Sequence, residues 1–488
     1  MYEKLNKIDL NYHLKHPGKG SEPGDPNAIF YSNGFYHLHY ILRHKWNGAN
    51  HNPPRKNFPF KHSHSFIHCT SKDMLNWKWK KTKLQPSFTK HGMFSGTGFM
   101  TLDKKLAIIY HGENTKQNFI IISKDYNLSK WSSPFPINEK KSNTNFWDPD
   151  CFIINNFYYS ISGGLKPRLF RSKNLQDWKY LGSFMKYDLD NVLKEEDISC
   201  PNFFKINNKW VLLCISHTHG CRYYIGKWDK EREKFIPEKH VRMNWQNNQD
   251  SKYYLENRDF FAPESVKTLD GRRVMWSWMR MQNIKNLNIL SIPRELDINK
   301  KNQLIIKPAR ELKKLRINKK NFKNIEIKTS TNKLDSVIKK NILLVKSHSF
   351  ELKIKINIKK IKNKRFGFEL FSNTKKEGFS IIFQPENKTI LVGSTEAPFN
   401  LTDIKDHKFL EINIFVDKFI IEVFVNNFQS VVGSYINYKT NNNISAYCLG
   451  DSLIIDSITL WNLKQANTGY KEAKKNKIWK VNEKLRIN

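Results

Sequence analysis

The sequence has no apolar run long enough to cross a bilayer, and its first residues lack the apolar core of a secretory signal. Cysteine is scarce, and the six residues are scattered without the spacing of a disulfide framework. Helical periodicity is nearly absent from roughly the first 300 residues. We therefore expect a cytoplasmic protein without a membrane partner, built mainly from strands. Its 488 residues exceed the usual size of one core, which indicates two domains.

Acidic residues are also few: 45 Asp and Glu stand against 83 Lys and Arg, giving a formal net charge of +38. Such an excess can indicate a nucleic-acid partner. The lysines, however, spread over the whole chain alongside abundant asparagine and isoleucine, and no nucleic-acid motif accompanies them. A compositional bias of the source genome explains the charge more simply, so we expect no nucleic-acid partner.

A short pattern recurs at a nearly fixed interval. Segments 71–77, 123–131 and 172–178 each begin with Ser-Lys and end with Trp, and Trp228 ends a degenerate fourth copy. Successive tryptophans lie 54, 47 and 50 residues apart. One four-stranded sheet per interval is typical of a β-propeller. We therefore predict a five-bladed β-propeller over residues 1–310.

Two Asp-Pro pairs each open an apolar strand that is followed by a hairpin turn. Asp25 precedes Pro26, and Asp148 precedes Pro149. Proline fixes its own φ and keeps the preceding residue out of the helical region, so each carboxylate stands on stiff backbone. A lone Asp-Pro is usually a simple turn. Two copies at the starts of innermost strands predict two carboxylates that meet in the central channel.

The composition and periodicity of the sequence change after Leu296. A Lys/Asn-rich connector over 312–324 leads into period-2 alternation, for example over 350–358 and 410–416, which is typical of a β-sandwich. We predict the sandwich over 325–465 and a poorly ordered basic tail over 466–488. The expected fold class is all-β, with a five-bladed β-propeller followed by a C-terminal β-sandwich.

An ordered set of motifs resembles glycoside hydrolase family 32, the group of invertases, levanases and inulinases. The motifs are found at residues 24–28, 68–73, 94–97, 147–149, 200–201, 259–263, 271–273 and 292–296. The resemblance implies a propeller followed by a sandwich, a carbohydrate substrate, and no metal or other cofactor. It also implies retaining hydrolysis of β-fructofuranosides such as sucrose or fructans.

The resemblance also implies roles for individual residues. Asp25 is implied to be the nucleophile that forms a fructosyl-enzyme, and Asp148 is implied to stabilise the oxocarbenium-like transition state. The residues implied to bind the sugar are Asn27, Phe94, Ser95, Trp147, Cys200 and Asp259.

One departure from the family pattern falls within the site. The family's acid/base glutamate directly precedes Cys-Pro, but Ser199 holds that position. A serine hydroxyl cannot protonate a leaving group near neutral pH, so either another carboxyl acts as the acid or the activity is lost. The sequence offers Glu196 and Asp197, just upstream, and Glu264, at the start of the next blade, as equally good candidates. Trp147 also replaces an arginine of the family pattern.

Several alternatives stay open. A catalytically impaired, sugar-binding propeller fits Ser199, and a fructosyltransferase would use the same covalent intermediate. The segment from Cys214 to Cys221 contains zinc-ligand residue types, including His217 and His219, but its spacing is too compact for familiar zinc sites. We expect these side chains to pack within a blade. The oligomeric state is not indicated.

Overall fold

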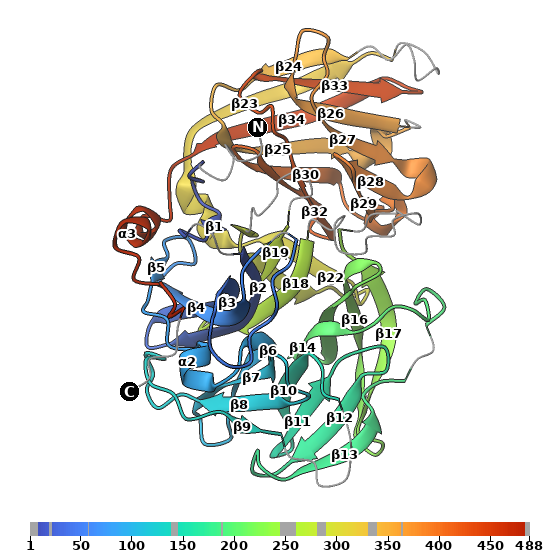
Figure 1. Cartoon of the computed structure of the whole chain (residues 1–488). Coiled ribbons are helices and arrows are strands. Elements are labelled where there is room, and N and C mark those ends of the chain that lie inside the picture. The colour runs from blue at the N-terminus through green and yellow to red at the C-terminus, as the bar shows by residue number, and fades with distance from the viewer. Residues whose placement is uncertain are drawn as a thin grey trace.

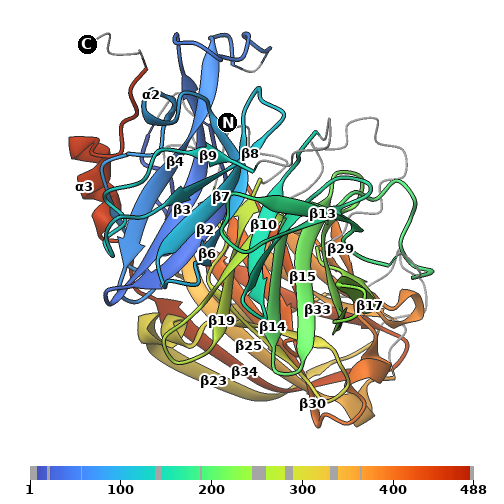
Figure 2. The same cartoon turned by 90° about the horizontal axis from the view of Figure 1, so that it is seen from below.

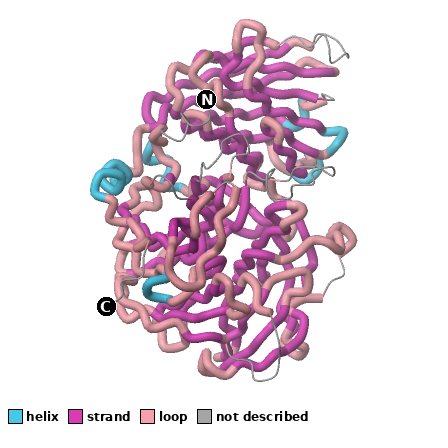
Figure 3. Tube along the Cα trace, in the orientation of Figure 1, coloured by secondary structure: helices cyan, strands magenta, loops and turns pink. Residues whose placement is uncertain are grey.

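The computed structural model describes residues 8–18, 22–56, 58–137, 145–186, 189–244, 260–280, 289–329, 339–362 and 365–483. A propeller forms one half of the molecule and a sandwich of two sheets forms the other (Figure 1). The predicted fold class is confirmed. Strands run through both halves, and helical segments are short (Figure 3). Among the described residues, no helix combines the length and apolar character needed to span a membrane.

Four blades are antiparallel sheets whose four strands follow in chain order. Blade 1 contains β2 (Glu22–Ser32), β3 (Phe35–Lys45), β4 (His62–Ser71) and β5 (Lys78–Trp79). Blade 2 contains β6 (Met93–Met100), β7 (Leu106–Gly112), β8 (Asn118–Ile122) and β9 (Phe135–Pro136). Blade 3 contains β10 (Pro149–Ile154), β11 (Phe157–Ser162), β12 (Arg168–Ser172) and β13 (Trp178–Ser183). Blade 4 contains β14 (Ser199–Ile206), β15 (Lys209–Ser216), β16 (Gly220–Asp229) and β17 (Lys234–Arg242).

The fifth blade closes the ring. It contains β18 (Phe260–Lys267), β19 (Arg273–Met279), β21 (Arg294–Ile298) and β22 (Leu304–Pro308). Strand β20 (Ile289–Leu290) also pairs with β19, and β1 (Leu14–Lys15) pairs with β20. Its first strand, β18, lies against β2 of blade 1. The view from below shows β6, β10 and β14 toward the middle, with β13 and β17 nearer the rim (Figure 2). The first strand of each blade therefore lines the channel.

The recurring Ser-Lys pattern forms the same turn three times. In each copy the tryptophan indole N–H donates to the carbonyl three residues earlier, from Trp77 to Met74, Trp131 to Leu128 and Trp178 to Leu175. The accepting residue has a positive φ in all three turns, between 55° and 67°. Trp228 differs from the prediction, because it lies within β16 and not in such a turn. The sequence repeat thus reflects a repeated turn between outer strands.

The sandwich contains two six-stranded sheets. The first is formed by β23 (Arg316–Ile327), β34 (Leu453–Leu463), β25 (Ser349–Asn357), β30 (Phe409–Asp417), β31 (Ile420–Val425) and β32 (Gln429–Ser434). The second is formed by β24 (Lys340–Leu344), β33 (Asn443–Leu449), β26 (Arg365–Ser372), β27 (Phe379–Gln384), β28 (Thr389–Val392) and β29 (Thr395–Pro398).

The segment expected to be a connector is part of this sandwich. After a short helical turn at Arg310–Leu315, residues 316–327 form the edge strand β23, which pairs with β34. Most of its side chains are exposed, and many are lysine or asparagine. Lysine on an edge strand discourages pairing with other chains, which explains why this strand has the composition of a linker.

The segment expected to be a poorly ordered tail is also structured up to residue 483. Helix α3 (Gly469–Asn476) packs beside blade 1, and Tyr470 and Trp479 join a buried cluster with Trp77. The Thr82 hydroxyl donates to the Trp479 carbonyl at 2.6 Å. A second helix, α2 (Pro86–Thr89), lies between blades 1 and 2. The prediction of a loose tail was wrong, because a few apolar residues anchor a segment that is otherwise basic.

A buried polar network joins the two domains. His13 lies between two sandwich carboxylates, with Nδ1 at 3.1 Å from Asp417 and Nε2 at 3.0 Å from Glu422. Arg294 of β21 also bonds to Glu422, at 2.5 Å. All four side chains have no exposed area. Burial alone lowers the pKa of His13, but the hydrogen bonds to both carboxylates outweigh it and raise the pKa to about 9.

Candidate active site

The channel strands are irregular at the end where they begin. The register of pairing between the first and second strands of the blade shifts between Pro23 and Pro26 in β2, and between Met93 and Gly96 in β6. Similar shifts occur between Ser199 and Asn202 in β14 and between Phe261 and Glu264 in β18. Cys200 and Ala262 have φ of 47° and 49° at these places. Such bulges re-aim side chains next to functional sites, and a positive φ at a non-glycine residue is strained.

The two predicted carboxylates converge on one thiol. Oδ2 of Asp25 and Oδ2 of Asp148 each lie 3.7 Å from Sγ of Cys200. Asp148 also accepts a hydrogen bond from the Cys200 backbone N–H at 3.0 Å, and Asp25 accepts one from the Ser95 hydroxyl at 3.3 Å. Side chains from blades 1 to 4 thus meet at one point. The predicted convergence of Asp25 and Asp148 agrees with this geometry.

The pKa values of the cluster follow from burial and from like charge. Burial first, and repulsion from Asp148 second, raise the pKa of Asp25 to about 6. Burial also raises the pKa of the Cys200 thiol, with further contributions from Asp25 and Asp148, so this thiol is neutral at physiological pH. Arg280 partly offsets the shift at Asp25. The cluster therefore holds a carboxylate whose protonation changes close to neutrality.

A second polar layer lies one step further along the same strands. Asp150 accepts hydrogen bonds from the Thr97 hydroxyl at 2.7 Å and the Phe203 N–H at 2.6 Å. Burial raises the pKa of Asp150 to about 6. Asn27 bridges blades 1 and 2, because it donates to the Asp25 carbonyl at 2.8 Å and accepts from the Gly96 N–H at 2.8 Å. In this structure Asn27 is only 1% exposed and holds the channel strands together.

Glu264 belongs to this second layer. It lies in the middle of β18 and not at its start as expected, and its electrostatic neighbours are Asp150 and Arg273. Burial, and then Asp150, raise the pKa of Glu264 well above its usual value. Within the described residues, no hydrogen bond or electrostatic interaction joins Glu264 to Asp25 or Asp148. The structure thus brings this candidate acid into the channel but not into contact with the Asp25 carboxylate.

The other two candidate acids lie beside blade 4 and are held by donors. Glu196 has no exposed side-chain area and pairs with Arg222 at 2.6 Å and with Arg242. Asp197 accepts hydrogen bonds from the Ser199 hydroxyl at 2.7 Å and from His217 Nδ1 at 2.6 Å. Burial opposes these bonds, but their sum lowers the pKa of Asp197 to about 2. Asp197 is therefore a poor proton donor near neutral pH, and Glu196 is engaged by two arginines.

Two exposed aromatic side chains stand directly before the cluster residues in the chain. Phe94 precedes Ser95 and is 38% exposed, and Trp147 precedes Asp148 and is 50% exposed. The Phe94 ring contacts His64 edge-on, and the Trp147 ring lies 5.8 Å from that of His111. Both rings are thus accessible from solvent. The remaining predicted sugar-binding residue, Asp259, lies outside the described residues.

Sequence reasoning assigned the histidine at position 217 to blade packing. The structure places His217 in the turn between β15 and β16, with a side chain 44% exposed and bonded to Asp197. No local pattern in the sequence indicates this bond, because it depends on the pairing of β15 with β14, in which Ile215 lies opposite Ser199. Cys214 and Cys221 of the same segment are buried within the blade. No group of metal-ligating side chains occurs in the described ranges.

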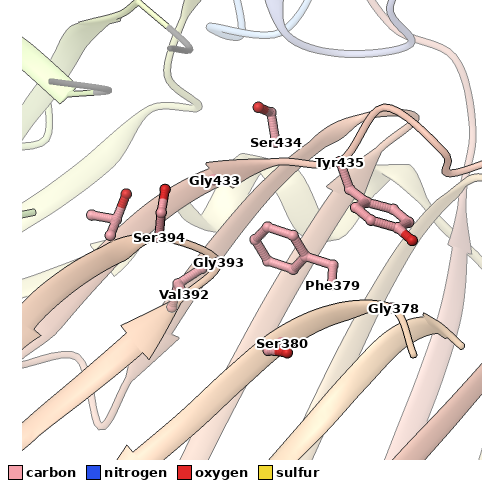
Figure 4. A pocket seen from close by; sticks show the side chains of 10 residues that line it. Gly378, Phe379, Ser380, Val392, Gly393, Ser394, Gly433, Ser434 and Tyr435 are labelled. Carbon is pink, nitrogen blue, oxygen red and sulfur yellow. The ribbon is translucent and has the colours of Figure 1, made fainter. Parts of the chain in front are cut away.

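A hollow of about 320 Å³ lies in the sandwich domain and not at the carboxylates. It is lined by Phe379 and Tyr435, with hydroxyls such as Ser394 and Ser434 around them (Figure 4). None of the predicted site residues contributes to it. This hollow is therefore separate from the place where the carboxylates meet.

Comparison with known proteins agrees with this architecture. The sucrose-6-phosphate hydrolase of Bacillus subtilis (strain 168) is 24% identical, over 90% of this chain and 91% of its own length. The levanase of the same strain is 23% identical, over 90% of this chain and 68% of its own length. Among solved structures, fructan 1-exohydrolase IIa from Cichorium intybus has a TM-score of 0.70 at 16% identity, covering 94% of this chain and 98% of that chain.

A second solved structure, the sucrose-6-phosphate hydrolase from Lactobacillus gasseri, has a TM-score of 0.69 at 20% identity and covers 94% of this chain and 93% of that chain. These likenesses show that the fold is shared.

Family models cover most of the sequence. The model described as Glycosyl hydrolases family 32 N-terminal domain matches residues 22–308, and the model of the family 32 C-terminal domain matches residues 311–462. The predicted family and the predicted glycosidase class are confirmed. The chain, with its carboxylates at the head of a five-bladed channel and its sandwich behind, belongs to the glycosyl hydrolases of family 32.

Proposed function

We propose that this protein is a retaining glycoside hydrolase of β-fructofuranosides, such as sucrose, fructo-oligosaccharides or fructans, with Asp25 as the nucleophile. The observation that carries the proposal is the approach of the Asp25 and Asp148 carboxylates to one atom, Cys200 Sγ, at 3.7 Å each. Retaining glycosidases need a carboxylate aimed at the anomeric carbon and a low-polarity, preorganised setting around it. Asp25 stands on a proline-fixed strand start and is 9% exposed.

The like charge of the two carboxylates has a use in this mechanism. Repulsion between Asp25 and Asp148 makes the substrate-free site electrostatically unfavourable. As the glycosidic bond breaks, positive charge develops on the sugar, and both carboxylates attract it. Asp25 then closes the bond to the anomeric carbon, while Asp148 is held in place by the Cys200 N–H at 3.0 Å. The pair therefore stabilises the transition state more than the ground state.

The mouth of the site suits a sugar bound through its apolar faces. Phe94 and Trp147 are exposed beside the cluster, and aromatic rings of this kind pack against the C–H faces of a sugar. The relatives are named for sucrose 6-phosphate and levan, which both contain β-fructofuranosyl units. We therefore propose a furanoside as the group that Asp25 attacks, with the linkage chosen by contacts at the mouth.

Covalent trapping tests the proposal. A mechanism-based β-fructofuranoside with an activated leaving group should label Asp25, and peptide mass spectrometry should locate the adduct. Asp25→Asn, which is nearly isosteric, should abolish both labelling and turnover without lowering the melting temperature by more than a few degrees. Sugar binding without labelling of the wild-type protein would instead favour the sugar-binding alternative suggested by Ser199. Products analysed with added sucrose would separate hydrolysis from fructosyl transfer.

A further inference from the structure

The position of the absent glutamate is filled by a different set of polar groups. The Ser199 hydroxyl donates to Oδ2 of Asp197 at 2.7 Å. In a glutamate at position 199, Cγ would replace this hydroxyl oxygen, and the carboxylate oxygens would lie about 2.4 Å beyond it. The Asp197 carboxylate therefore lies at about the distance that a glutamate carboxylate would reach. Asp197 is thus the carboxylate that bonds to the side chain at position 199.

Asp197 itself is arranged to stay ionised and to accept hydrogen bonds. It accepts three hydrogen bonds, from Ser199 Oγ at 2.7 Å, from the His217 backbone N–H at 2.7 Å and from His217 Nδ1 at 2.6 Å. Its own backbone carbonyl is fixed by Arg222 at 2.7 Å. These bonds lower the pKa of Asp197 to about 2 against the effect of burial. The carboxylate stays ionised and orients the imidazole.

His217 is connected to the surroundings of the reacting carboxylates by a series of side-chain contacts. Its ring is 6.1 Å from that of Phe261 at the start of β18, and Phe261 in turn is 6.1 Å from Trp278. Arg280 lies over Trp278, and its charge acts on Asp25. On its other side His217 is linked through Asp197 to Ser199, the neighbour of Cys200. The imidazole is therefore connected to Asp25 through intervening side chains on one side and to Cys200 through Ser199 on the other, and its side chain is 44% exposed.

We propose that His217, oriented by Asp197, is the general acid and base of this site in place of the family's glutamate. The inference rests on the proposed function above. Asp25 attacks the anomeric carbon, and the bond to the leaving oxygen breaks with its electron pair on that oxygen. The oxygen takes the proton from Nε2 of the imidazolium. Neutral His217 then takes a proton from water, which attacks the same carbon and releases Asp25 as carboxylate.

Imidazole chemistry fits this exchange. Histidine gives and takes a proton near neutral pH, and a carboxylate on Nδ1 fixes the tautomer and stabilises the imidazolium. The same division of labour between an aspartate and a histidine operates in serine hydrolases. Here the aspartate is held by a serine that has no catalytic step of its own. The four hydrogen bonds at Asp197 thus orient a proton donor next to Ser199, the chain neighbour of Cys200.

The test uses leaving groups of different basicity. His217→Gln should lower kcat on sucrose or a fructo-oligosaccharide by about 10²–10⁴-fold, because a sugar alkoxide needs a proton. On nitrophenyl β-fructofuranoside, whose leaving group needs little protonation, the rate of the first step should fall by less than about tenfold. Added azide should restore turnover of this substrate and yield the β-fructosyl azide. His219→Gln, in the same turn, is the matched control and should behave as the wild type.

The outcomes separate this inference from the proposed function. An equal loss of rate on both substrates, or no loss of rate on sucrose, would overturn the role of His217. The role would also be overturned if Glu264→Gln, and not His217→Gln, showed the dependence on the leaving group. If the wild-type protein labels at Asp25 while His217→Gln stays fully active on sucrose, only the inference about His217 fails. If the wild-type protein does not label, both proposals fail. A second variant, His217→Ala with added imidazole, should regain activity if His217→Gln folds poorly.

Discussion

Replacing His13 by glutamine should destabilise the protein in a pH-dependent way. His13 is enclosed between Asp417 and Glu422 with no exposed side-chain area on any of the three. Glutamine can keep hydrogen bonds but cannot carry the positive charge. In His13→Gln, the Asp417 and Glu422 carboxylates stay buried without the positive charge between them. Removing one partner of a buried ion pair costs roughly 3–5 kcal/mol.

The pKa of His13 gives an independent estimate of this stabilisation and the direction of its pH dependence. Its folded-state pKa is about 9, against 6.5 for the ordinary group. Because one pKa unit corresponds to about 1.4 kcal/mol, the shift is worth roughly 3 kcal/mol. A raised pKa means that the folded state binds the proton more tightly. The stabilisation is therefore complete below about pH 6.5 and is lost as the pH rises through about 9.

Urea unfolding at pH 6.5 and at pH 9.5 measures both effects. The wild-type free energy of unfolding should fall by roughly 3 kcal/mol between these pH values. His13→Gln should be less stable than the wild type at pH 6.5, and its free energy of unfolding should fall less. His407→Gln, at an exposed histidine, is the control and should follow the wild type. A His13→Gln variant within about 0.5 kcal/mol of the wild type at pH 6.5 would refute the charged bridge.

Three further variants test the site and its frame. Asp148→Asn removes the charge that repels the Asp25 carboxylate and so should lower the pKa of Asp25. The labelling rate of the wild type should fall below about pH 6, and in the variant this fall should occur at lower pH; an unchanged pH profile would contradict the repulsion between the two carboxylates. Glu196→Gln breaks a buried pair with arginines and should lower stability by roughly 3–5 kcal/mol, measured by urea unfolding, whereas loss of kcat at unchanged stability would restore it as an acid candidate. Trp479→Ala should cost about 3–5 kcal/mol, and exposed Ile478→Ala far less; equal melting temperatures would show that the C-terminal segment does not anchor blade 1.

Local sequence patterns predicted much of the frame. The Ser-Lys to Trp segments indicated the blades because each forms the same turn, closed by an indole hydrogen bond within the segment. The Asp-Pro pairs indicated Asp25 and Asp148 because proline restricts its own neighbour. Edge strand β23 and helix α3 were missed because their stabilising partners, β34 and blade 1, are distant in sequence. Their own composition resembles that of linkers.

The sequence by itself determined the class of fold, the family and the two aspartates, because each is expressed in short-range order along the chain. Only the tertiary structure decided which other groups share their space. A step of two residues along a strand is about 6.6 Å, and the bulges near Cys200 and Ala262 change which residue faces which level of the channel. That displacement puts Glu264 with Asp150, and a turn between two strands brings His217 to Asp197. The position of a proton donor depends on such distances, which no local pattern contains.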